Sequence, residues 1–157
     1  MIEPNQFRVE IVQKALKAIN LWSLEAEELL MLTAAQESQL GYYIKQVNGS
    51  ALGVFQMMPE TYSDIIINYL SHNVDLKHTI LKVLNMIQMP SAEKLVHNLF
   101  FAAIMCRVHY LRIKDPIPPA NNILALANYY KRFYNSSLGA ATIEQAIANY
   151  NKFVGKK

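Results

Sequence analysis

Residues 23–41 read Ser-Leu-Glu-Ala-Glu-Glu-Leu-Leu-Met-Leu-Thr-Ala-Ala-Gln-Glu-Ser-Gln-Leu-Gly, and this stretch decides the fold. Ser23 is typical of a helix N-cap, and the acidic residues that follow lie where the positive end of the helix dipole favours them. We therefore predict a helix that begins after Ser23 and runs to about Leu40. Its later turns are almost wholly apolar, and Glu37 comes near its end.

The next segment, residues 41–59, interrupts the helical pattern. It contains Gly41, Asn48-Gly-Ser and Gly53, and Pro59 ends it. Glycine and the Asn-Gly pair are strong turn signals, so we expect a loop or a short irregular hairpin here.

Helical periodicity covers most of the remaining chain. The connector at residues 114–119 is stiff because it contains three prolines, but it is too short to separate two domains. Thr142 and Gln145 have the spacing of a capping box. We expect a mainly α fold, with one domain over residues 1–157 and the loop inserted after the second helix. The other predicted helices are 5–20, 59–70, 76–88, 91–113, 120–134 and 142–153.

Composition excludes several classes of protein. Apolar residues make up 52% of the 157 residues and charged residues 17%, which is typical of a compact globular domain. A net charge of +3 is too weak to indicate nucleic-acid binding. Cys106 is the only cysteine and lies in an apolar run, so we expect a buried side chain. The four histidines lack the spacing of a metal site, and no cofactor is predicted.

The N-terminus has no visible signal peptide. Met1-Ile-Glu-Pro-Asn lacks a basic segment followed by an apolar stretch. No apolar window reaches the length of a membrane span, so membrane insertion is not expected.

Glu37 is the candidate for acid catalysis. Apolar neighbours desolvate a carboxyl group and raise its pKa, and the negative end of the helix dipole acts in the same direction. A carboxyl that stays protonated near neutral pH can donate a proton to a glycosidic oxygen. The alternative at this point is a helix-terminal glutamate that lies in solvent.

The loop after this helix carries a second pattern. In combination, the two stretches resemble the soluble and phage-borne lytic transglycosylases of the lysozyme-like superfamily, whose signature is Glu-Ser followed by Gly-Ala-x-Gly-Leu-Met-Gln and a nearby Pro. Glu37-Ser38 matches the pair. Ser50 replaces the first glycine of the second motif, and Val54-Phe55 replaces Leu-Met. The matching positions of that motif are Ala51, Gly53, Gln56 and Pro59.

Two weaker matches follow in the same order as in the family. His97-Asn98 stands where Glu-Asn is usual, before a helix with Tyr110-Leu-Arg. Ala127-Asn-Tyr-Tyr130 is nearest to the Ala-Tyr-Asn motif, with Tyr130 in place of the asparagine. The resemblance spans residues 24–135, and it implies an α+β lysozyme-like fold.

The resemblance implies a role for each matching residue. Glu37 would be the single catalytic acid and base, Ser38 would orient Glu37 or the sugar, and Gln56 would hydrogen-bond the saccharide. Tyr129 would lie over the catalytic carboxyl. Further substrate-binding candidates are Phe55, Tyr130 and Tyr43. Each of these side chains also has a purely structural interpretation, at a helix end, in a turn or in the core.

The number of carboxylates separates two kinds of glycan cleavage. Hydrolytic glycosidases generally need a second carboxylate, whereas residues 38–59 contain no Asp or Glu. Glu60 and Asp64 come next, at the start of a predicted helix where acids are common. A lytic transglycosylase needs one acid only, because the sugar's own C6 hydroxyl acts as the nucleophile.

We therefore expect a peptidoglycan lytic transglycosylase that forms 1,6-anhydromuramyl ends and acts on glycan strands in the periplasm or cell wall. The alternatives are a hydrolysing muramidase, a non-catalytic murein-binding or virion module of the same fold, and a helical interaction protein with chance matches. Without a leader, delivery would fall to a phage, as an endolysin or tail-associated enzyme, or to a secretion system.

Overall fold

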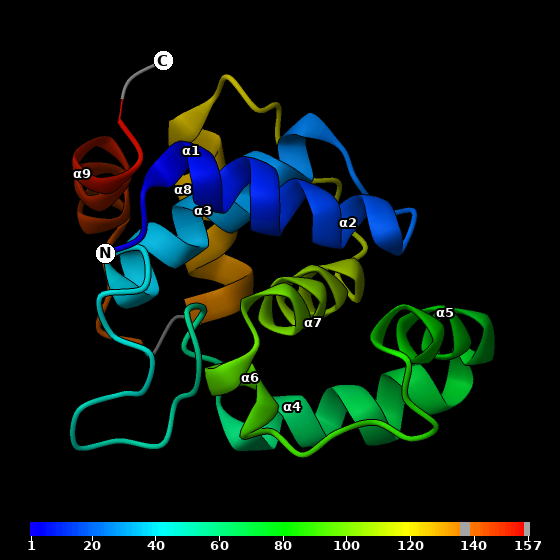
Figure 1. Ribbon diagram of the computed structural model, residues 1–157. Coiled ribbons are helices and arrows are strands. Elements are labelled where there is room, and N and C mark those ends of the chain that lie inside the picture. The colour runs from blue at the N-terminus through cyan, green and yellow to red at the C-terminus, as the bar shows by residue number, and fades with distance from the viewer. Residues whose placement is uncertain (136–138, 156–157) are drawn as a thin grey trace.

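The computed structural model describes residues 1–135 and 139–155, which form a single all-helical domain (Figure 1). The mainly α prediction is confirmed. The β pairing in this described part consists of two isolated bridges, Lys45–Leu52 and Leu52–Met57, within the predicted irregular loop. The helices in chain order are α1 (Pro4–Gln6), the π-helical η1 (Phe7–Gln13), α2 (Lys14–Ala18), α3 (Leu24–Ser38), α4 (Pro59–Asp64), the π-helical η2 (Ile65–Tyr69), the 3-10 turn η3 (Leu70–His72), α5 (Val74–Leu84), α6 (Lys94–His97), α7 (Leu99–Leu111), α8 (Ile123–Tyr130), the π-helical η4 (Lys131–Asn135) and α9 (Ile143–Phe153).

One predicted helix is divided in the structure. The segment 91–113 was predicted to be continuous, but Asn98 has extended backbone angles (φ −135°, ψ 100°) between α6 and α7. Its side-chain oxygen accepts a hydrogen bond from the backbone N–H of Phe101. Asparagine is a strong N-cap residue, so a new helix begins after Asn98. The apolar periodicity on its own had predicted one continuous helix. The capping box of Thr142 and Gln145 and the Ser23 N-cap are confirmed.

Helix α3 is the centre of the domain (Figure 1). Every residue from Ala26 to Ala35 is buried, so the helix has no solvent face over about 2.8 turns. It packs against η1, α7, α8 and α9. Thr33 ties it to α7, because its hydroxyl lies 2.8 Å from the hydroxyl of Tyr110. A helix that is buried on all sides must be surrounded by other elements, and this explains why the 23–41 stretch organises the fold.

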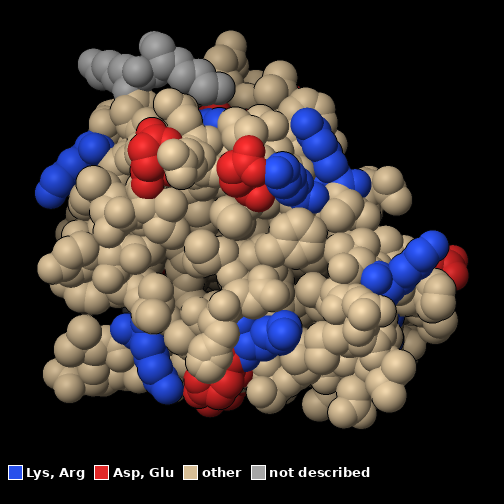
Figure 2. Space-filling model, in the orientation of Figure 1, with Lys and Arg blue, Asp and Glu red and all other residues tan. Residues whose placement is uncertain are grey.

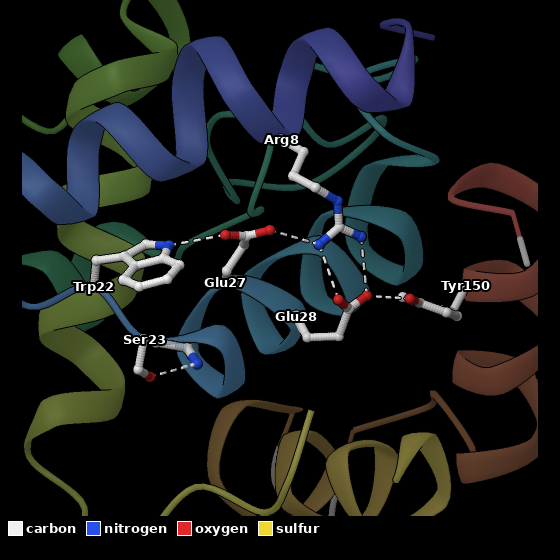
Figure 3. A network of polar contacts seen from close by, with 7 residues as sticks. Arg8, Trp22, Ser23, Glu27, Glu28 and Tyr150 are labelled. Carbon is white, nitrogen blue, oxygen red and sulfur yellow. Dashed lines mark hydrogen bonds and ion pairs between the residues drawn. The ribbon is translucent and has the colours of Figure 1, made fainter. Parts of the chain in front are cut away.

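A buried ionic network holds three helical segments together (Figure 3). The guanidinium of Arg8, on η1, donates to Glu27 at 2.9 Å and to both oxygens of Glu28 at 2.8 and 3.0 Å. The indole N–H of Trp22 donates to Glu27 at 2.8 Å, and the hydroxyl of Tyr150, on α9, donates to Glu28. These contacts fix η1 and α9 on the N-terminal half of α3, at the end opposite Glu37.

The surface shows no strong charge segregation on the face in Figure 2. Lysine and arginine side chains lie singly or beside acidic ones, and the described residues on this face form no continuous basic stripe. No helix in the described ranges combines the length and apolar character needed to cross a bilayer.

Candidate active site

The C-terminal end of α3 is closed by Ser38. Its buried hydroxyl donates to the carbonyl of Ala34 at 3.1 Å and accepts from the backbone N–H of Gly41 at 2.8 Å. The next three residues, Gln39, Leu40 and Gly41, all have left-handed backbone angles, with φ of 53°, 56° and 78°. This conformation costs a residue with a side chain about 1–2 kcal/mol. The tight reversal leaves Glu37 on the last turn of the helix.

The loop after α3 folds back beside Glu37 and is held at Gly53. Its backbone has φ +74°, and a Cβ atom there would lie 2.3 Å from the carbonyl oxygen of Leu95. Only glycine fits so close an approach, so this match to the family motif has a direct structural reason. Three residues later, Gln56 also has a left-handed conformation (φ 46°), and its side-chain N–H donates to the Gly53 carbonyl at 2.8 Å.

Glu37 is partly buried, and its carboxyl has a hydrogen-bond partner on a neighbouring helix. The hydroxyl of Tyr130, on α8, donates to Glu37 Oε1. Burial raises the pKa of Glu37 from 4.5 to about 7, and the Tyr130 hydrogen bond lowers this pKa by less than burial raises it. The predicted rise of the Glu37 pKa is therefore confirmed, and desolvation is its main cause. Burial also raises the pKa of Tyr130 well above its usual value, so this hydroxyl remains a donor.

Behind Glu37 lies a cluster of aromatic rings from α7, α8 and η4. Tyr134 stacks on Tyr130, with ring centroids 6.0 Å apart and an interplanar angle of 25°. Its other neighbours are Tyr110 at 5.3 Å and His109 at 4.8 Å. The hydroxyl of Tyr134 donates to the backbone carbonyl of Phe55 at 2.7 Å. Tyr134 thus joins the helical wall to the loop wall across the site.

These walls enclose a cleft of about 630 Å³, within the usual size range of ligand sites. Glu37 lines it, and its other lining side chains are aromatic, amide or aliphatic. They are Tyr43, Gln46, Val47, Ala51, Gln56, Met58, Tyr134, Asn135 and Gly139.

The structure brings together some of the predicted site residues. Glu37, Gln56 and Tyr43 line the same cleft. Tyr130 is fully buried and reaches the cleft through its hydrogen bond to Glu37. Ser38 does not line the cleft, and its buried hydroxyl caps the end of α3 next to Glu37. Its role in orienting Glu37 stays a prediction.

Two further predicted site residues, Phe55 and Tyr129, do not line the cleft either. The Phe55 side chain is 2% exposed and packs towards Phe7 in the core, with ring centroids 6.2 Å apart. Tyr129 does not lie over Glu37. Its hydroxyl donates to the Asp115 carbonyl at 2.9 Å, and its ring lines a separate pocket. Adjacent helical residues point about 100° apart, so one of the pair Tyr129-Tyr130 must face away, and the one that faces Glu37 is Tyr130.

Several cleft residues were not predicted, among them Tyr134 and Gln46. Tyr134 follows Tyr130 by four residues, so this spacing on one helical face could have indicated that the two rings lie together. Gln46 carries no motif signal. It reaches the cleft because its backbone pairs with Ala51, through a 2.9 Å hydrogen bond from its N–H to the Ala51 carbonyl.

Glu37 is the only acidic side chain among the described residues that line the cleft. Asp64 is ion-paired with Arg112 at 2.6 Å, and hydrogen bonds from Asn68 and Arg112 lower its pKa. Glu60 is exposed in the first turn of α4. Both carboxylates belong to helix α4, and neither lines the cleft. In the described ranges, no three His, Cys, Asp or Glu side chains are grouped so as to hold a metal ion.

Comparison with known protein families, curated proteins and solved structures gave no match. The resemblance to lytic transglycosylases thus depends on the motif residues, and the cleft has to be interpreted from its own chemistry.

Proposed function

We propose that this chain is a peptidoglycan lytic transglycosylase in which Glu37 is the single catalytic acid and base. The observation that carries the proposal is a ligand-sized cleft in which Glu37 is the one carboxyl among the described lining residues, with a pKa raised to about 7 by burial. Near neutral pH a substantial fraction of such a group is protonated, and its conjugate base is strong enough to take the proton back.

The reaction would proceed in two proton transfers. Tyr130 donates to Glu37 Oε1, so Oε2 is the oxygen that would carry the carboxyl proton. Oε2 donates this proton to the glycosidic oxygen as the C1–O bond breaks. The resulting carboxylate then accepts the proton of the C6 hydroxyl of the same muramyl residue, and O6 bonds to C1. No water is consumed, and the enzyme ends in its starting protonation state.

Tyr130 would also act as a positioning residue. Its hydroxyl holds one carboxyl oxygen, and its ring is stacked on Tyr134. A neutral donor stabilises the carboxylate that forms after the first proton transfer. It thereby limits how far burial can raise the Glu37 pKa.

A single carboxylate among the described lining residues favours transglycosylation over hydrolysis. A hydrolytic enzyme needs a second carboxyl about 5–9.5 Å from the acid, either as nucleophile or to activate water. Apart from Glu37, the described residues that line the cleft carry amide, tyrosine and apolar side chains. An intramolecular hydroxyl needs no such partner, because its effective concentration is already high.

The test is the chemistry of the products. Purified sacculi incubated with the protein should release soluble fragments with 1,6-anhydro ends, one water lighter than hydrolysis products by mass spectrometry. Glu37→Gln should abolish this release while circular dichroism shows an unchanged helical fold. Reducing ends would indicate a hydrolysing muramidase. Wall binding without any soluble fragment would indicate a non-catalytic module.

A further inference from the structure

The N-terminal residues lie against the turn that follows α3 (Figure 1). The backbone N–H of Ile2 donates to the carbonyl of Leu40 at 2.8 Å. The next residue, Glu3, is the N-cap of α1, because its carboxylate accepts the backbone N–H of Gln6 at 2.7 Å. Ile2 is therefore held between the start of α1 and the end of the central helix.

The side chain of Ile2 covers Gly41. A Cβ atom at Gly41 would lie 2.8 Å from Ile2 Cδ1, 3.2 Å from Ile2 Cγ1 and 3.6 Å from Val54 Cγ2. Ile2 is partly buried and packs against the core. Three segments that are distant in the sequence thus meet at Gly41, namely the N-terminal residues, the turn after α3 and the returning loop.

The N-terminal segment is also bound to the other end of α3. Arg8, on η1, donates to Glu27 and Glu28 in the buried ionic network. The contacts of Arg8 and Ile2 together fix α1 and η1 along α3, from Glu28 to Leu40 (Figure 1). The turn therefore cannot shift relative to the rest of α3 unless Ile2 moves or its contacts break.

The turn depends on contacts from outside itself. Gln39 and Leu40 have left-handed backbone angles, a conformation that is strained for residues other than glycine. The N–H of Leu40 donates back to the Ala34 carbonyl at 3.0 Å, whereas its own carbonyl accepts from Ile2. The turn is thus hydrogen-bonded to α3 on one side and to the N-terminal segment on the other.

The turn, residues 39–41, connects two residues of the cleft. Glu37 is the second residue before it and Tyr43 the second residue after it, and both line the cleft. The N–H of Tyr43 donates to the carbonyl of Ser38, the residue that follows Glu37, at 3.2 Å. A displacement of the turn would therefore move Tyr43 and loosen the last turn of α3, where Glu37 lies.

We propose that Ile2 is a positioning residue of the active site, whose N–H and side chain hold the turn at residues 39–41 and thereby keep Glu37 and Tyr43 in place on the cleft. This inference rests on the proposed function, because it gives Ile2 a role in the reaction. It also implies a change in Glu37 itself that can be measured without any activity.

The first measurement is the pKa of Glu37 by carbon-detected NMR titration of its carboxyl, with Glu37→Gln to assign the signal. Ile2→Ala removes the atoms that contact Gly41, so water reaches the last turn of α3 and the Glu37 pKa should fall from about 7 by at least about 1. Ile2→Val lacks only Cδ1 and should lower this pKa by less. Ile2→Leu keeps the apolar volume and the backbone N–H, so the pKa should stay within about 0.3 of the wild-type value.

The second measurement is wall cleavage. Ile2→Ala should release soluble fragments from sacculi about tenfold more slowly, because a small displacement of a catalytic group lowers the rate strongly. The decline of its cleavage at alkaline pH should move to lower pH, in step with the Glu37 pKa. Val9→Ala is the matched control, because it shortens a branched apolar side chain of η1 that is 44% exposed, and both measurements should equal those of the wild type. Thermal melting verifies that each variant is folded.

The outcomes separate this inference from the proposed function. A lower Glu37 pKa and slower cleavage in Ile2→Ala, without either change in Ile2→Leu or Val9→Ala, support the inference. An unchanged Glu37 pKa in folded Ile2→Ala and Ile2→Val proteins would overturn it, as would wild-type cleavage despite a lower pKa, or equal changes in Val9→Ala. If the wild-type protein cleaves no wall, the proposed function fails, and the pKa comparison alone decides whether Ile2 holds Glu37 in place.

Discussion

Replacing Glu37 by Gln should stabilise the folded protein at neutral and alkaline pH. The carboxyl is partly buried, and desolvation is the main cause of its raised pKa. The ionised carboxylate is therefore less stable in the folded state than in the unfolded state. Glutamine has nearly the same shape and no charge, and its Oε1 can accept the Tyr130 hydrogen bond in place of the carboxyl oxygen. The substitution therefore removes the cost of the charge and retains the packing.

The magnitude follows from the pKa. The rise from 4.5 to about 7 corresponds to roughly 3 kcal/mol, at about 1.4 kcal/mol for each pKa unit. Below pH 4.5 the carboxyl is protonated in both the folded and the unfolded state, so the two proteins should be equally stable. Between pH 4.5 and 7 only the unfolded state ionises freely, and the wild type loses stability. Above pH 7 the difference should be complete.

Urea unfolding at pH 4, 6 and 8.5 measures this difference directly. In thermal melts at pH 8.5, roughly 3 kcal/mol should appear as a Tm about 6–12 °C higher in Glu37→Gln. Glu60→Gln is the matched control. Because it removes an exposed carboxylate from the first turn of α4, it should destabilise the protein by no more than about 1 kcal/mol. A Glu37→Gln protein equally or less stable than wild type at pH 8.5 would refute a desolvated carboxyl at this position.

Three further changes test other parts of the structure. Tyr130→Phe removes the hydrogen bond that lowers the Glu37 pKa, so the decline of wall cleavage at alkaline pH should move to higher pH; an unmoved pH profile would exclude this contact from the mechanism. Arg8→Met removes the guanidinium that pairs with two buried glutamates and should cost about 3–5 kcal/mol in urea unfolding, whereas a loss below about 1 kcal/mol would show that this contact is unimportant for stability. Gly53→Ala introduces a Cβ 2.3 Å from the Leu95 carbonyl oxygen, so it should displace the loop from Glu37 and reduce wall cleavage, while thermal melting shows that the helical domain is still folded. Wild-type cleavage would show that the position of this loop is unimportant for activity.

Local signals in the sequence were sufficient for most helix positions. N-caps act within four residues of themselves, and this is why the start of α3 and the capping box of α9 were predicted correctly. The break at Asn98 has the same local cause, a capping side chain, but the apolar periodicity on both sides of it masks the signal.

The orientation of neighbouring aromatic residues could not be predicted in this way. Tyr129 and Tyr130 are both tyrosines on one helix, and the family motif favoured the first. The structure directs Tyr130 to Glu37 because α8 packs on α3 through that face, and Tyr129 turns towards the Asp115 carbonyl instead. Phe55 lies in the core while its neighbour Gln56 lines the cleft. The two side chains point in different directions because the backbone turns tightly at Gln56.

By itself, the sequence determined the helical class, the apolar central helix and a carboxyl at its end, because periodicity, capping and burial of apolar side chains are properties of short segments. Only the tertiary structure decided which side chains meet that carboxyl. The partners of Glu37 lie about a hundred residues away on α8 and η4 or in the returning loop. These residues come close to Glu37 because α8 packs on α3 and because Gly53 lets the loop backbone lie against the Leu95 carbonyl.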